Sequence, residues 1–272
     1  MIEVVIQVAI EVVMSSGARA AFEPSPFRSP VSESVMSRPM PRPMPRLLVS
    51  VRDAAEAEAA IRAGADLIDA KDPENGALGA LPPETVRAIV ARTAGRATTS
   101  AVAGEPAVEA RQAAIRAMAE TGVAWVKVAV RPDWLADPAA LRAAADAAPG
   151  RLVAVLFAED DPEPDCAPRL AAAGFIGAMI DTAVKDGRRL PDLVDGARMS
   201  AFTAAVHDSG LLSGLAGSLR VDDIPGLAAH RPDYLGFRGG LCRDGDRRNA
   251  LDARRLAEAV RALRRPAARD AA

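Results

Sequence analysis

Lysine is nearly absent from this chain of 272 residues, which has 34 basic residues but only three lysines. The other 31 basic residues, the difference between these two counts, are arginine. Either residue can usually serve as a surface cation, whereas only lysine readily loses its proton and attacks a carbonyl carbon. This scarcity indicates that Lys71, Lys127 and Lys185 lie where an amine is needed.

Other shortages exclude whole classes of protein. The net charge of −2 lacks the positive excess of a nucleic-acid-binding protein, so no nucleic-acid partner is expected. The only cysteines, Cys166 and Cys242, lie far apart without metal-ligand spacing, which favours free thiols and a cytoplasmic location. No apolar run approaches the ~20 residues of a membrane-spanning helix, so no membrane partner is expected either.

The first 45 residues differ in composition from the rest of the chain. Their opening imitates a signal peptide, but it lacks a basic start and contains Glu3 and Glu11. The following stretch is rich in proline, serine and arginine, a composition that does not build a packed core. We predict that residues 1–45 are a disordered or irregular extension, or reflect a start codon placed too far upstream, and that residues 266–272 form a tail.

Between residues 46 and 265, short apolar runs alternate with helical stretches rich in alanine and arginine. Strands separated by helices pair in parallel through right-handed crossovers, and strands that are apolar throughout are buried on both faces. No GxGxxG motif supports a dinucleotide-binding fold. Eight strand–helix units predict an α/β fold, a single (β/α)₈ TIM barrel. The expected strands are 47–51, 66–71, 97–103, 125–130, 152–157, 175–182, 211–218 and 234–240.

All three lysines belong to even-numbered strands. Lys71 ends the second strand, Lys127 lies within the fourth, and Lys185 follows the sixth. Such barrels carry their chemistry at the C-terminal ends of the strands, and alternate strands supply one layer of interior side chains. Asp69 lies on the same side as Lys71, and Asp181 ends the sixth strand. We therefore predict that these five residues converge as a catalytic group. The alternative is that each lysine is a solvated or ion-paired surface residue.

Glycine-rich turns follow the last two strands, where TIM barrels frequently bind phosphate through backbone N–H groups. Glycine in such turns can also serve backbone geometry alone. With the lysines, the turns predict a phosphorylated carbonyl compound that is handled through an imine. The charged loop 242–248 either covers this site or is solvated surface. The candidate phosphate-binding residues are Gly217, Ser218, Arg238, Gly239 and Gly240.

These residues lie in blocks that resemble the (5-formylfuran-3-yl)methyl phosphate synthase family of methanofuran biosynthesis. The likeness runs from about residue 47 to about residue 250, and the blocks are DLIDAKDPENGALGA, SAVAGEP, WVKVAV, AMIDTAVKDG, LAGSLRVDDIP and GFRGGLCRDGDR. The resemblance implies a lyase that condenses two molecules of glyceraldehyde 3-phosphate to 4-(hydroxymethyl)-2-furancarboxaldehyde phosphate. It also implies a homo-oligomer without a cofactor.

The resemblance assigns roles to residues by position. Lys71 matches the family's Schiff-base lysine and Lys127 its proton-accepting lysine. The supporting acid–base groups are matched by Asp69, Asp181 and Lys185.

Two other functions stay open, namely another Schiff-base aldolase of class I acting on a sugar phosphate, and a barrel that binds a phosphorylated metabolite without catalysis. A metal-dependent aldolase lacks its His/Glu ligand set here, so no metal is expected.

Overall fold

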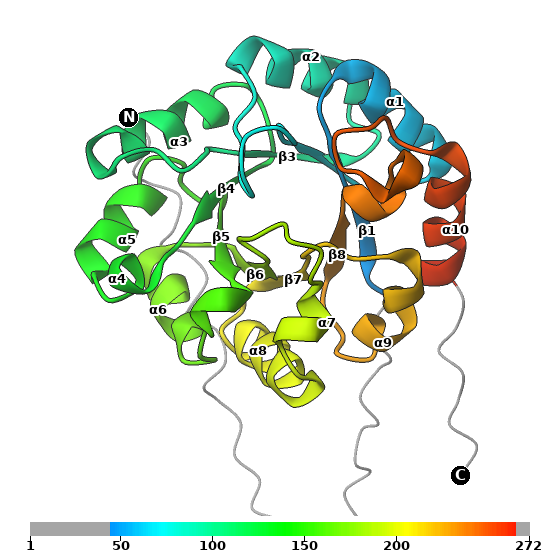
Figure 1. The fold of residues 1–272 in the computed structure, drawn as a ribbon. Coiled ribbons are helices and arrows are strands. Elements are labelled where there is room, and N and C mark those ends of the chain that lie inside the picture. Colours follow the sequence, from blue (N-terminus) through cyan, green and yellow to red (C-terminus); the bar gives the residue numbers. More distant parts are fainter. Residues whose placement is uncertain (1–43, 265–272) are drawn as a thin grey trace, which may run out of the picture. The chain divides into compact units, whose positions relative to one another are not determined.

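The computed structural model describes residues 44–264, and the predictions made for residues 1–43 and 265–272 lie outside that range. Eight parallel strands close into a barrel in sequence order, as Figure 1 shows along the barrel axis. This confirms the predicted TIM barrel. The strands are β1 (Arg46–Val51), β2 (Leu67–Ala70), β3 (Thr98–Val102), β4 (Trp125–Ala129), β5 (Leu152–Phe157), β6 (Gly177–Asp181), β7 (Leu212–Leu215) and β8 (Tyr234–Phe237).

Helices surround the strands on the outside of the barrel (Figure 1). The helical stretch between β6 and β7 is divided into two helices. Val194 is extended, and the Asp195 carboxylate accepts a hydrogen bond from the N–H of Arg198 and so caps the start of the second helix. The helices are α1 (Ala54–Ala63), α2 (Pro83–Thr93), α3 (Arg111–Ala119), α4 (Pro132–Leu135), α5 (Pro138–Ala145), α6 (Cys166–Ala173), α7 (Leu190–Leu193), α8 (Gly196–Asp208), α9 (Ile224–Ala228) and α10 (Ala253–Arg264).

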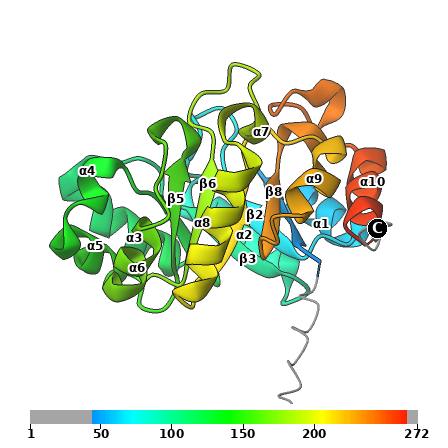
Figure 2. The same ribbon diagram turned by 90° about the horizontal axis from the view of Figure 1, so that it is seen from below.

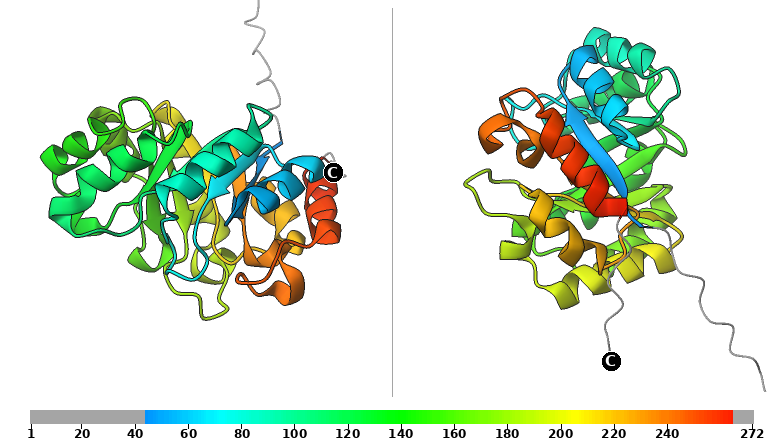
Figure 3. Two further views of the ribbon diagram at one scale, coloured as in Figure 1. Left: turned by 90° about the horizontal axis from the view of Figure 1, so that it is seen from above. Right: turned by 90° about the vertical axis from the view of Figure 1, so that its right-hand side faces the viewer.

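Helix α1 shows how the chain turns locally between a strand and a helix. Its first turn is capped by the Asp53 carboxylate, which accepts a hydrogen bond of 2.8 Å from the N–H of Glu56. Its last turn ends at Gly64, which has a φ of +99°. Glycine adopts this left-handed conformation without steric cost because it has no Cβ. Helix α10 lies beside α1 and β1 and completes the outer ring (Figure 3).

Two apolar clusters form the core. The larger one fills the space between the strands and the surrounding helices. The smaller one fills the barrel interior and includes Leu48, Leu67, Val153 and the fully buried Tyr234. Successive side chains of a strand point to opposite faces, so every second strand residue enters this interior. The apolar cluster therefore forms a floor beneath the polar residues at the C-terminal ends of the strands.

The loops that follow β6 and β8 project from the same end of the barrel (Figure 2). This is the C-terminal end of the strands, because all pairings between neighbouring strands are parallel. Within residues 44–264, no helix has the length and apolar character needed to cross a membrane.

Candidate active site

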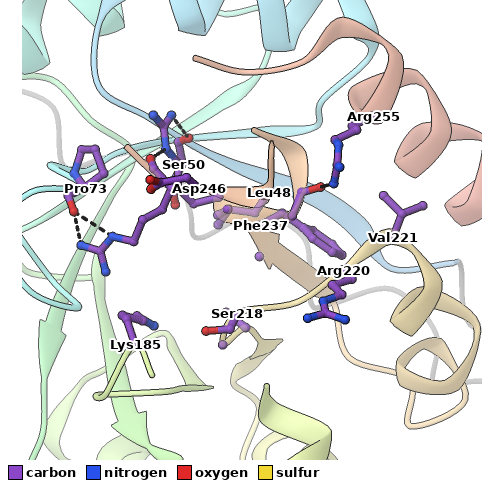
Figure 4. Close-up of a pocket in the computed structure, with 18 of the residues that line it drawn as sticks. Leu48, Ser50, Pro73, Lys185, Ser218, Arg220, Val221, Phe237, Asp246 and Arg255 are labelled. Atoms are coloured by element: carbon purple, nitrogen blue, oxygen red, sulfur yellow. Dashed lines mark hydrogen bonds between the residues drawn. The ribbon is translucent and has the colours of Figure 1, made fainter. Parts of the chain in front are cut away.

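A cavity of about 990 Å³ opens at the C-terminal end of the barrel. All three lysines of the chain line it, together with Asp181 and residues of the glycine-rich turns after β7 and β8. Figure 4 shows Lys185 and Ser218 along one edge of this cavity, with Arg220 beside Ser218. Residues that are more than 100 positions apart in sequence thus share one enclosed space.

Asp69 is the centre of the first polar cluster. Its Oδ1 lies 2.7 Å from Lys127 Nζ and accepts a hydrogen bond of 2.6 Å from Ser100 Oγ, and its Oδ2 accepts one of 3.0 Å from Ser50 Oγ. The parallel register places Ser50, Asp69 and Ser100 side by side on β1, β2 and β3. Sequence analysis missed both serines, although each is a polar residue at an interior-facing position of an apolar strand.

Asp181 is the centre of the second cluster and binds two lysines. Its Oδ1 lies 3.0 Å from Lys185 Nζ, and its Oδ2 lies 3.5 Å from Lys71 Nζ. Strands β2 and β6 are on opposite sides of the closed barrel. The Lys71 side chain must therefore cross the mouth to reach Asp181, which places its amine near the barrel axis.

The environment changes the protonation of these groups. Burial lowers the pKa of Lys127 more strongly than the Asp69 charge raises it, and the charge of Lys71 lowers it further. Burial also lowers the pKa of Lys185 against the opposing charge of Asp181. Burial by itself would raise the pKa of Asp181, but the charges of Lys185 and Lys71 hold it below its ordinary value. Asp181 is therefore a stable carboxylate, while Lys127 and Lys185 become neutral bases more readily than ordinary lysines.

The two glycine-rich turns present unused N–H groups. Within residues 44–264, the N–H groups of Gly217 and Ser218 donate no hydrogen bond. Gly239 and Gly240 begin the 3₁₀ turn Gly239–Leu241, so their N–H groups have no acceptor inside it. Such groups at the end of a barrel are suited to bind the oxygens of a phosphate.

Arg238 lines the cavity, but the nitrogens of its guanidinium already have acceptors. Its Nε donates to Arg247 O at 2.8 Å, Nη1 donates to Ser50 O at 3.1 Å, and Nη2 donates to Asn249 O at 3.1 Å. Its guanidinium also pairs with the carboxylate of Glu56, and both side chains are 8% exposed. The geometry does not support the prediction that Arg238 is a charge partner of phosphate; Arg238 instead anchors the β8 turn to β1 and α1.

Four other arginines of the described residues line the cavity, namely Arg220, Arg247, Arg254 and Arg255. Arg220 follows the β7 turn, is exposed and lies beside Ser218, so it is better placed than Arg238 to face a phosphate (Figure 4). Arg247 donates from Nε to Pro73 O at 2.7 Å and from Nη2 to Gly76 O at 2.6 Å. The charged loop 242–248 therefore reaches the loop after β2 and covers part of the site.

Glu159 holds the loop that carries Lys185. Its carboxylate accepts hydrogen bonds from the N–H groups of Ala183 at 2.8 Å and Val184 at 3.0 Å. Partial burial raises the pKa of Glu159, but these hydrogen bonds outweigh it and lower the pKa overall. This residue follows β5, and no sequence motif pointed to it.

Replacing Glu159 by alanine should lower kcat/KM about tenfold, because Lys185 and Asp181 lose the support that positions them. Glu163→Ala is the matched control, since Glu163 is an exposed carboxylate in the same loop, and among residues 44–264 its side chain bonds to Arg198 alone. Steady-state kinetics of both variants checks the prediction. Equal activity of the two variants would show that Glu159 does not position the site.

Replacing Gly240 by alanine should raise KM for a phosphorylated substrate about tenfold or more. A Cβ at this position would collide with the carbonyl oxygen of Leu219 and push the β7 and β8 turns apart, which removes the aligned N–H groups. Gly226→Ala is the control, since a Cβ there meets no atom within 4 Å. An unchanged KM in Gly240→Ala would argue against phosphate binding at these turns.

Two other polar side chains, those of His207 and Asp72, have structural partners. His207 Nε2 lies 3.0 Å from Asp233 Oδ2 and 2.8 Å from Ser213 Oγ. The carboxylate of Asp72 accepts hydrogen bonds from the N–H of Glu74 and the amide of Asn75, within its own loop. In the part of the chain that the structure describes, no group of three or more His, Cys, Asp or Glu side chains is arranged to hold a metal ion.

The sequence profile of one family, described as 4-HFC-P synthase, matches residues 47–260. A protein of Methylorubrum extorquens, named provisionally as a (5-formylfuran-3-yl)methyl phosphate synthase, is 61% identical over 226 residues, which cover 83% of this chain and 94% of that protein. The (5-formylfuran-3-yl)methyl phosphate synthase of Methanopyrus kandleri is 36% identical over 234 residues, with 79% of this chain and 98% of that protein covered.

Solved structures show the same barrel at low sequence identity. The phosphoribosyl anthranilate isomerase of Thermus thermophilus superposes with a TM-score of 0.59 at 17% identity, over 80% of this chain and 98% of that one. A structure of KGPDC from Streptococcus mutans superposes with a TM-score of 0.56 at 14% identity, over 81% and 97%. At this identity the likeness establishes the fold alone.

Proposed function

Because this chain belongs to the 4-HFC-P synthase family, we propose that it is a lyase that condenses two molecules of glyceraldehyde 3-phosphate to (5-formylfuran-3-yl)methyl phosphate. One observation carries this proposal. Three lysine amines and two carboxylates meet at the barrel mouth, beside turns with unused N–H groups. Amines of this kind activate carbonyl compounds, and the turns suit a phosphate ester.

The reaction starts at Lys71 in this proposal. Its side chain is 11% exposed, compared with 4% for Lys127, so its amine is more accessible to a carbonyl carbon from the cavity. One triose phosphate first isomerises to its ketone form. Attack of Lys71 on a carbonyl group, with loss of water, gives an imine whose protonated form withdraws electrons from the neighbouring carbon. Lys127 then accepts the proton of that carbon, and the Asp69 carboxylate stabilises the ammonium that forms.

The enamine of the triose that keeps its aldehyde carbon expels its phosphate, and its terminal carbon then attacks the C2 carbonyl carbon of the ketone triose. This bond gives the branched carbon skeleton of the product. Lys185 and Asp181 lie beside Lys71 and serve as acid and base for the later proton transfers. Ring closure and loss of two waters give the aromatic furan, and hydrolysis of the imine frees Lys71. The balance is two triose phosphates to one furan phosphate, one inorganic phosphate and two waters.

Incubation of the purified protein with glyceraldehyde 3-phosphate alone tests this function. We expect the ultraviolet absorbance of a furan aldehyde to appear together with one inorganic phosphate for each furan. A sugar phosphate without released phosphate would identify a simple aldolase instead. Binding without any product would identify a barrel that binds a phosphorylated metabolite.

The proposal extends to the setting of the enzyme. We place it in the biosynthesis of a methanofuran-type coenzyme, in the cytoplasm and as a homo-oligomer. The names of its relatives support the first of these assignments, and the two free cysteines, Cys166 and Cys242, both buried, support a reducing compartment.

A further inference from the structure

A second, smaller cavity of about 170 Å³ lies between the loops that follow β3 and β4. Arg111, Arg131 and Trp134 line it, with the exposed Glu105 at its edge. In the closed barrel β3 and β4 lie opposite β7 and β8, so this cavity and the glycine-rich turns are on opposite sides of the mouth.

The small cavity is close to the catalytic lysines. Ala129 lines it and lies two residues beyond Lys127 on β4. Residues two apart in a strand share one face and are separated by about 7 Å along the strand, so Lys127 is the next interior side chain below the cavity. A ligand held there can extend directly to the reacting groups.

Two donors of this cavity lack an acceptor within residues 44–264. Trp134 is 4% exposed, and its buried indole Nε1 has no hydrogen-bond partner there. The Arg111 guanidinium lies 3.9 Å from the centre of the Trp134 ring and makes neither an ion pair nor a hydrogen bond with a described residue. A buried polar group without a partner is rare in proteins, so the Trp134 N–H points to a ligand that supplies an acceptor. The half-buried Arg111 guanidinium beside it can bind the same ligand.

The charges at this cavity favour an anion. Arg131 also contributes a guanidinium, which is neutralised in part because Nη2 lies 3.0 Å from Asp160 Oδ1. Glu105 is the acid at the cavity edge, and it is exposed to solvent. The cavity volume corresponds to several water molecules at about 30 Å³ each, which is enough for a phosphate group.

We propose that this cavity binds the phosphate group of the second triose phosphate, with Arg111 and the indole N–H of Trp134 as its donors. This inference rests on the proposed condensation of two triose phosphates. Two phosphate dianions repel each other strongly, and binding on opposite sides of the mouth keeps them apart. Both three-carbon chains then extend toward the centre, where Lys71 and Lys127 act.

Calorimetric titration with glycerol 3-phosphate tests the site without catalysis, since this compound has the phosphate and the carbon chain but no carbonyl group. We expect the wild-type protein to bind two molecules per chain. Arg111→Gln and Trp134→Phe should each weaken one of the two sites about tenfold or more, because each removes a hydrogen bond to a charged group. Arg116→Gln is the matched control, an exposed arginine on the same helix that bonds only to Gln112.

Two results would overturn the proposal, namely a single site in the wild-type protein, or two sites of unchanged affinity in Arg111→Gln. Kinetics separates this outcome from failure of the proposed function. In Arg111→Gln, borohydride trapping of one triose phosphate on Lys71 should persist while half-maximal furan formation needs more substrate. If the wild-type protein forms no furan, the proposed function fails, and the titration still decides whether the cavity binds a phosphate ester.

Discussion

Replacing Lys71 by arginine should abolish furan formation, with kcat lowered about 10⁴-fold or more. Arginine keeps the positive charge, and therefore the attraction to Asp181 that Lys71 Nζ makes at 3.5 Å, but a guanidinium does not lose its proton and cannot form an imine. Furan absorbance measures the loss. Mass spectrometry after borohydride reduction should find the substrate-derived mass on Lys71 in the wild-type protein and on no lysine in the variant.

The controls for Lys71→Arg concern folding and binding. Its thermal unfolding midpoint and its affinity for glycerol 3-phosphate should stay close to those of the wild-type protein, because the charge at the barrel axis is kept. Turnover at the wild-type rate in this variant, or borohydride labelling of another lysine alone, would disprove the assignment of Lys71 as the nucleophile.

Replacing Asp69 by asparagine should lower both activity and stability. Lys127 Nζ lies 2.7 Å from Asp69, and its side chain is 4% exposed, so the variant leaves a buried ammonium without its counter-ion. Breaking such a pair costs about 3–5 kcal/mol of unfolding free energy. We expect kcat to fall about 10²–10⁴-fold, since the ammonium that forms on Lys127 during proton transfer is no longer stabilised.

The stability loss of Asp69→Asn should depend on pH in a defined direction. Burial already lowers the pKa of Lys127, and removal of the Asp69 charge lowers it further. Between this lowered pKa and the unfolded value of about 10.4, the folded protein binds fewer protons than the unfolded one, so its stability rises with pH. Urea unfolding should therefore show the largest loss in acid and neutral solution and a smaller one toward pH 10.

A second substitution supplies the control for this pair. Asp69→Asn combined with Lys127→Met removes the unpaired charge, so the double variant should be more stable than Asp69→Asn alone and inactive. A loss of stability that does not change with pH, or no recovery in the double variant, would show that Lys127 is not held as a buried ammonium by Asp69.

Much of the polar cluster at the barrel mouth could be predicted from sequence because strand residues follow simple rules. Alternation along β2 places Asp69 and Lys71 on the interior face, and the position of Lys127 within β4 follows in the same way. Lys185 lies outside a strand, four residues after Asp181. In the structure its Nζ lies 3.0 Å from Asp181 Oδ1. Local periodicity and scarcity of one residue type were sufficient for these assignments.

Sequence rules say least about the contacts of side chains in loops. Arg238 follows a glycine-rich strand and was predicted to face phosphate, but it pairs with Glu56, which is 182 positions away. No residue near Arg238 in the sequence indicates that the Glu56 carboxylate is its partner. Glu159, which holds the loop before Lys185, was missed for the same reason, because its partners are backbone N–H groups of another strand–helix unit.

The sequence by itself determined the eight strand–helix units, the end of the barrel at which the lysines lie, and the residues that enter its interior. These properties depend on the alternation of side chains and on the parallel connection of neighbouring strands, which are local. Tertiary structure alone decided that Lys71 crosses the mouth to Asp181, that Arg238 is bound elsewhere, and that Arg111 and Trp134 enclose a second cavity. Such contacts join opposite or distant strands and loops, and they exist only once the barrel has closed.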